Sequence, residues 1–133
     1  MAADERLICR AGDLEEGGRG IRFQVVSDGQ ILPAFVVRHG GRVRGYLNRC
    51  GHIPVELDYQ PGAFFEPGRL YLICSTHGAL YDPASGACVS GRCGGRGLTP
   101  VALEERSDGV YLTDLAMSMH KQGCRPSAQP PVP

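Results

Sequence analysis

Two short segments each place a cysteine and a histidine close together: Cys50-Gly51-His52 and Cys74-Ser75-Thr76-His77, with 21 residues between His52 and Cys74. Thiolates are soft, negatively charged ligands, and imidazoles are neutral ligands that can lose a proton. Two of each suit either a tetrahedral zinc ion or a [2Fe–2S] cluster in which two histidines replace two cysteines on one iron. The ligand types alone leave both centres open.

The residues around the two pairs narrow this choice. The first pair reads C-x-H, and the second continues as CSTHGALYDPASG, which is C-x-x-H-G followed by Y-D-P-x-x-G. This combination resembles the Rieske family, and the resemblance is strongest from about Tyr46 to Leu98. A lone C-x-x-H would be a weak signal, whereas the combination is specific.

The resemblance implies one [2Fe–2S] cluster and a role for each ligand. Cys50 and Cys74 would hold the inner iron, and His52 and His77 would hold the outer iron near the surface. The backbone would pass close to the cluster at Gly78, and Tyr81 would donate a hydrogen bond to a ligand sulfur. Backbone N–H groups along both loops would point at the sulfides. The neighbours of the cluster implied in this way are Gly51, Gly78 and Tyr81.

Departures from the respiratory members of the family point to a different subgroup. Those members carry an extra cysteine after each pair, joined as a disulfide, and the matching positions here are Val55 and Thr76. Their serine donor to a sulfide corresponds to Ala79, so one donor to the reduced cluster is lost. We therefore expect a potential in the lower or middle part of a range of about −150 to +300 mV. The resemblance is closer to the soluble ferredoxins that serve bacterial ring-hydroxylating dioxygenases.

Two features near the pairs leave alternatives open. Cys88 and Cys93 are either a local disulfide or lid over the cluster, or two small, partly buried thiols, and the reducing cytosol favours the thiols. The apolar residues after His52 either form an exposed docking rim or pack against Phe64, Phe65 or Leu80, and packing is favoured. These apolar residues are Ile53, Pro54, Val55 and Leu57.

The rest of the chain predicts an all-β domain that positions the pairs. The 133 residues include 19 glycines and 10 prolines, which is typical of short strands joined by turns. Strands are expected at Leu7–Cys9, at Ile21–Val26, from Pro33 to a Gly40-Gly41 hairpin turn and back to Asn48, at Leu70–Ile73, and in a last hairpin of Val101–Glu105 and Val110–Leu115. We expect a single Rieske domain over 1–116, in which a small antiparallel base sheet or sandwich supports an inserted cluster-binding lobe of about 46–98. The proline-rich residues 117–133 are predicted to be disordered.

Charge and hydropathy restrict the partners. Lys plus Arg and Asp plus Glu both number 14, which argues against a nucleic-acid binder. No window is apolar enough for a membrane anchor or a secretory leader, so a soluble, cytoplasmic protein is expected.

The predicted function is a soluble one-electron carrier, without an organic substrate of its own, that passes electrons from a reductase to an oxygenase-type acceptor. After the cluster is ligated only His39 and His120 remain, and they are poorly placed for a second, catalytic iron. The alternatives are a Rieske subunit or redox sensor of a larger oxidoreductase, and a zinc-stabilised interaction module.

Overall fold

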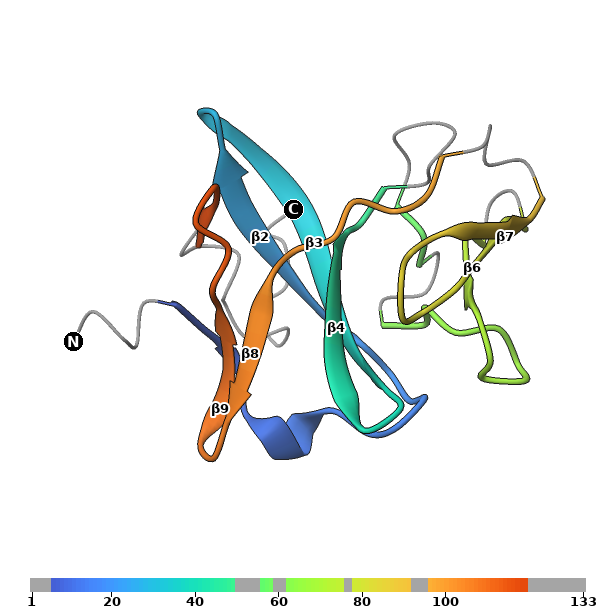
Figure 1. Cartoon of the computed structure of the whole chain (residues 1–133), viewed down its shortest axis with the longest axis horizontal. Helices are drawn as coiled ribbons and strands as arrows, with labels where there is room; N and C mark the ends of the chain where they lie inside the picture. Colours follow the sequence, from blue (N-terminus) through green and yellow to red (C-terminus); the bar gives the residue numbers. More distant parts are fainter. Residues whose placement is uncertain (1–5, 50–55, 59–61, 76–77, 92–95, 120–133) are drawn as a thin grey trace, which may run out of the picture.

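The computed structural model describes residues 6–49, 56–58, 62–75, 78–91 and 96–119 (Figure 1). Apart from one turn of 3-10 helix, η2 (Ala11–Asp13), the regular structure in these ranges consists of antiparallel strands, which confirms the all-β prediction. The strands are β1 (Leu7–Cys9), β2 (Ile21–Ser27), β3 (Gln30–His39), β4 (Arg42–Leu47), β5 (Leu72–Ile73), β6 (Leu80–Tyr81), β7 (Cys88–Ser90), β8 (Leu103–Arg106), β9 (Gly109–Leu112) and β10 (Ser118–Met119).

The base of the molecule contains two small sheets, with strand orders β10-β2-β3-β4 and β1-β9-β8. The predicted turn between β3 and β4 is present, and Gly40 and Gly41 adopt φ values of +65° and +77° there, as a two-residue hairpin requires. The guanidinium of Arg38 on β3 joins the sheets through hydrogen bonds of 2.9 and 2.6 Å to the carboxylate of Glu105 on β8. The shared core consists of Leu14, Phe23, Val25, Ala34, Val36, Leu47, Val101, Val110 and Leu112.

Strand β3 is buried on both of its faces. Side chains alternate across a strand, so Ala34 and Val36 enter the base core whereas Phe35 and Val37 enter a second core on the opposite face. All four side chains have no exposed surface. An uninterrupted apolar run is typical of a strand covered on both sides, and β3 therefore forms the wall between the base and the lobe.

The lobe lies between β4 and β8 in the chain and is built on the sheet β5-β6-β7 (Figure 1, right). Its core is continuous with the outer face of the base sheet, where the rings of Phe35 and Phe64 stack with centroids 4.0 Å apart. The ring of His39 lies 6.3 Å from that of Phe65 and adds a second contact. The lobe core consists of Phe35, Val37, Tyr46, Leu57, Phe64, Leu72, Cys74, Ala79, Tyr81 and Leu98.

Several strand boundaries differ from the predicted ones. The strand predicted at Leu70–Ile73 is only Leu72–Ile73, because the carboxylate of Glu66 accepts hydrogen bonds from the N–H groups of Gly68 and Leu70 and holds a turn there. The last hairpin is also shorter at both strands, with Ser107 and Asp108 in its turn.

The end of the domain also lies further along the chain than predicted. Strand β10 pairs with β2 beyond residue 116, and Met117 and Met119 pack on the base core. The boundary expected after residue 116 is therefore at least three residues too early, because methionine side chains continue the apolar surface. Residues 120–133 lie outside the described residues, so the disordered tail stays a prediction.

Candidate metal centre

Cys74 is the one predicted ligand that the described residues include. It directly follows β5, has no exposed surface, and is a thiol rather than half of a disulfide. Its N–H donates to the carbonyl of Ala79 at 2.9 Å, and its own carbonyl accepts from the N–H of Gly78 at 2.7 Å. These bonds close a tight loop that contains the position of His77, which itself lies outside the described residues.

Gly78 adopts a backbone conformation that favours glycine. Its φ is +75°, and no protein heavy atom of the described residues lies within 4 Å of the place where a Cβ would stand. Among the described residues the glycine is therefore required by the backbone turn and not by crowding. These residues leave room beside it for a group bound against the backbone.

Tyr81 lies on β6, the central strand of the lobe sheet, between Leu72 on β5 and Cys88 on β7. Its side chain is fully buried, so the sheet holds the ring in one place. This position suits the predicted neighbour of the cluster, and the hydrogen bond from Tyr81 to a ligand sulfur stays a prediction. The first pair with its glycine, Cys50, Gly51 and His52, lies outside the described residues.

Three N–H groups of the second loop are bonded to carbonyls, and the prediction that other N–H groups of the loops point at the sulfides stays a prediction. The N–H groups of Cys74, Ser75 and Gly78 donate to the carbonyls of Ala79, Leu57 and Cys74, at 2.9, 3.0 and 2.7 Å. A donor committed to a carbonyl at these distances makes its normal hydrogen bond there. The loop uses these groups to hold its own shape.

Leu57 resolves part of the choice between a docking rim and packing. It has no exposed surface and belongs to the lobe core with Phe64, so it packs inward as favoured. The other three residues of that set, 53–55, lie outside the described residues.

Cys88 corrects one expectation. Of the two alternatives left open, thiols were favoured, and the structure has Cys88 in a disulfide. The expectation came from the reducing cytosol, which determines whether such a bond persists in the cell and not whether the chain geometry permits it. Cys93, the other cysteine of the predicted pair, lies outside the described residues.

The segment after β7 packs directly on the second loop. Gly91 has a φ of +94°, and a Cβ at this position would lie 2.8 Å from Cα of Ala79 and 3.3 Å from the carbonyl oxygen of Gly78. Only a residue without a side chain permits this approach of two backbones. Gly91 therefore sets how closely the segment after β7 lies against the Cys74 loop.

A turn follows Tyr81, within the Y-D-P-x-x-G motif, and a side chain of the base holds it. The Asp82 carbonyl accepts from the N–H of Gly86 at 2.7 Å, and Gly86 has a φ of +79°. The hydroxyl of Tyr46 on β4 donates to the carbonyl of Pro83 at 2.7 Å. Burial of this phenol raises the pKa of Tyr46 to about 12, so it stays a donor throughout the neutral range.

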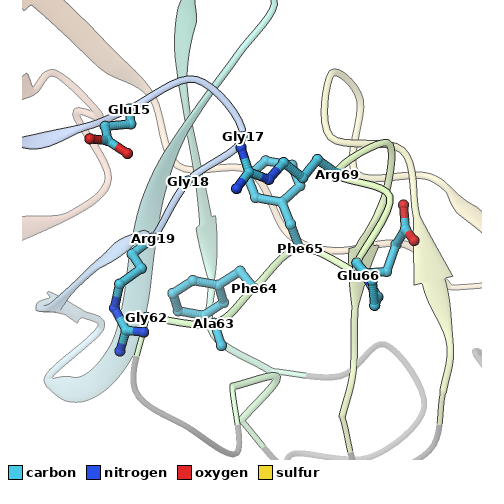
Figure 2. Close-up of a pocket in the computed structure, with 11 residues that line it drawn as sticks. Glu15, Gly17, Gly18, Arg19, Gly62, Ala63, Phe64, Phe65, Glu66 and Arg69 are labelled. Atoms are coloured by element: carbon cyan, nitrogen blue, oxygen red, sulfur yellow. The ribbon is translucent and has the colours of Figure 1, made fainter.

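A groove of about 360 Å³ opens where the lobe meets the N-terminal part of the base, and sequence reasoning missed it (Figure 2). Its walls carry the side chains of Arg19 and Arg69 together with Phe64 and Phe65. The aliphatic stem of Arg69 packs against Gly17, whose φ is +66°. None of the lining residues is a predicted cluster ligand. The available signal for this groove was the 21-residue spacer between His52 and Cys74, because residues of this spacer form one wall of the groove.

The described residues contain no cluster of three or more His, Cys, Asp and Glu side chains able to hold a metal ion, as three of the four predicted ligands lie outside them. Nothing helical in these parts of the chain has the length and apolarity that a membrane crossing requires.

Comparison with known proteins is consistent with this geometry. The model of the Rieske [2Fe–2S] domain matches residues 5–103. The structure is similar to the ferredoxin of carbazole 1,9a-dioxygenase from Nocardioides aromaticivorans IC177, with a TM-score of 0.63 and 22% identity, covering 82% of this chain and 95% of that one. It is also similar to a chain in the complex of reduced oxygenase and oxidized ferredoxin in carbazole 1,9a-dioxygenase, with a TM-score of 0.58 and 20% identity, covering 81% and 92%. No curated protein matches the chain.

Proposed function

Because the chain belongs to the Rieske [2Fe–2S] domain family, we propose that Cys50, His52, Cys74 and His77 hold its cluster. Family membership also decides between the two centres that the ligand types left open, in favour of the [2Fe–2S] cluster over zinc. The bound cluster supplies one-electron redox chemistry. We propose that the chain uses it as an electron carrier.

The described residues fit this group. Cys74 provides a thiol at the base of a loop, in surroundings that exclude water, and a ligand thiol must give up its proton to bind iron. Gly78 leaves the side of the loop open next to it, and Tyr81 presents a buried ring from the central strand. The chain's own contribution is to hold the ligands, to limit the access of water and to keep Tyr81 in place.

The match of the Rieske domain model over residues 5–103 carries the carrier proposal. The similarity in fold to a dioxygenase ferredoxin supports it, since 95% of that chain is covered. On this proposal a reductase supplies the electron and an oxygenase-type protein accepts it through the histidine edge of the lobe. The chain would be soluble and cytoplasmic, would transform no organic substrate itself, and would bind neither nucleic acid nor membrane.

Metal and acid-labile sulfide analysis with an EPR spectrum of the dithionite-reduced protein tests the ligand set. We expect two irons and two sulfides per chain and an average g value below that of clusters with four cysteine ligands. Cys74→Ser should abolish the signal, whereas Cys9→Ser, a change at a thiol of the base, should leave it unchanged. A Cys74→Ser protein that keeps a full Rieske-type signal would contradict the ligand assignment.

Electron exchange separates a carrier from a fixed subunit or sensor. A carrier should be reduced by a ferredoxin reductase and reoxidised by an oxygenase component in repeated turnovers, with rates that rise with its concentration. A protein that exchanges no electrons with soluble partners and remains bound to one large enzyme through purification would favour the subunit. In that case the carrier proposal is wrong even if the cluster is present.

A further inference from the structure

Asn48 is the only asparagine in the chain, and it lies at the junction of β4 with the first ligand segment. Its side chain has no exposed surface. The backbone N–H of Asn48 donates to the carbonyl of Pro33 at 2.8 Å, which fixes the residue to β3. A buried carboxamide needs hydrogen-bond partners for its N–H donors and its oxygen acceptor. The identity of these partners shows which segments the side chain connects.

Both ends of this carboxamide bind the far side of the same loop. The Oδ1 atom of Asn48 accepts a hydrogen bond from the N–H of Leu57 at 2.8 Å, and its Nδ2 donates to Oδ1 of Asp58 at 3.0 Å. The donor and acceptor partners determine which way the amide is turned. Asn48 thereby closes the loop of residues 49–56, which contains Cys50 and His52.

Asp58 extends the connection back to the base. Only 5% of the residue is exposed, and its Oδ2 atom accepts from the N–H of Gly62 at 2.9 Å. The guanidinium of Arg22 on β2 forms an ion pair with the same oxygen at 3.5 Å. A buried carboxylate is tolerated where its oxygens are bonded in this way.

The same network reaches the second ligand segment. The carbonyl of Leu57 accepts a hydrogen bond from the N–H of Ser75 at 3.0 Å, and Ser75 follows Cys74 directly. One backbone unit, Leu57, is therefore bonded to Asn48 through its N–H and to the Cys74 loop through its carbonyl.

Building on the proposed ligand set, we propose that Asn48 and Asp58 are positioning residues that keep the Cys50–His52 segment in register with the Cys74–His77 segment. Neither residue touches the metal on this account. They act through Leu57, whose position determines the separation of the two loops. Their loss should speed the release of iron, and this effect should be larger than for a base-core variant that lowers stability by the same amount.

Matched variants test the complementarity of the pair. Asn48→Asp places an acceptor against the Oδ1 acceptor of Asp58. Asp58→Asn makes two donors face each other whichever way the new amide is turned, either against Nδ2 of Asn48 or against the N–H of Gly62. In the swap variant, Asn48→Asp with Asp58→Asn, every hydrogen-bond donor again faces an acceptor. Such a double-mutant cycle isolates the pairwise contribution.

The assay is the rate of iron release to a chelator from the loaded protein, with the EPR g values and line widths of the reduced form. We expect each single variant to release iron roughly tenfold faster or more, the cost of a mismatched buried hydrogen bond, with broadened EPR features. The swap should recover most of the wild-type rate and line shape. Val110→Ala, which perturbs the base core alone, should lower the thermal midpoint without a matching gain in iron release.

Either of two results overturns the inference. The first is that the single variants release iron no faster than Val110→Ala does, when the variants compared have lost the same amount of thermal midpoint. The other is a swap variant that releases iron, or fails to fold, as the single variants do. A wild-type protein without a Rieske-type signal would overturn the proposed function and this inference with it, whereas an intact wild-type signal with unaffected variants overturns the inference alone.

Discussion

Replacing Gly91 with alanine should push the segment after β7 away from the Cys74 loop. The new Cβ would lie 2.8 Å from Cα of Ala79, a backbone atom that cannot swing aside as a side chain could. The φ of +94° adds a cost of roughly 1–2 kcal/mol for an L-residue, and overpacking against a fixed neighbour adds about 1–3 kcal/mol. Gly91→Ala should therefore destabilise the protein by about 2–5 kcal/mol.

Gly29→Ala provides the matched control. Gly29 also has a positive φ, +76°, but no heavy atom of the described residues lies within 4 Å of its Cβ position. Its substitution should cost only the backbone part, about 1–2 kcal/mol. Denaturant unfolding of both variants measures the difference, and iron release by the loaded proteins reports whether the loops have moved. Equal stability and equal iron release for the two variants would refute a close contact between Gly91 and Ala79.

Three further predictions concern the base and its junction with the lobe. Phe64→Ala removes the ring stacked on Phe35 and should cost about 3–5 kcal/mol, measured by denaturant unfolding; a cost below 1 kcal/mol would contradict the shared core. The Arg38 guanidinium lowers the pKa of Glu105, so this carboxylate stabilises the fold above its unfolded-state pKa of about 4.3 and loses that contribution as the pH falls through the lowered value. Thermal midpoints between pH 6 and 3 should fall less steeply for Glu105→Gln than for the wild type, and parallel curves would refute the linkage. Burial, followed by the charge of Asp13, raises the pKa of Cys9 to about 12, so at pH 8 mass spectrometry should find Cys9 alkylated only after unfolding.

The sequence predicted the fold class and the candidate ligands for identifiable reasons. The Gly40-Gly41 turn is recognisable because two consecutive positive φ values leave few alternatives to glycine. The alternation of Ile21–Val26 corresponds to β2, although that strand extends to Ser27. Cys74 was placed at the end of a strand, and the structure has it directly after β5. Local patterns of this kind depend on neighbours in the chain, which the sequence displays directly.

Features that depend on distant residues were not predictable in the same way. Asn48 was read as the last residue of a strand, because its partners Leu57 and Asp58 are nine and ten positions away. The disulfide of Cys88 was disfavoured from the expected compartment, which does not determine geometry. The partners of Asn48 lie in another segment of the chain, which a local pattern does not display. The shortened strand β5 has a local cause instead, because the Glu66 carboxylate accepts hydrogen bonds from Gly68 and Leu70, two and four residues later, and this turn replaces the start of the strand.

The two-sided burial of β3 bears on how such a molecule can diverge over time. Alternate residues of this strand serve different cores, so drift at Ala34 and Val36 is constrained by the base, and drift at Phe35 and Val37 by the lobe. The remaining members of each core can change semi-independently, which lets a lineage remodel the lobe for a new redox partner on an inherited base. Because the four positions of β3 together contribute to both cores, we expect them to change more slowly than the rest of the framework.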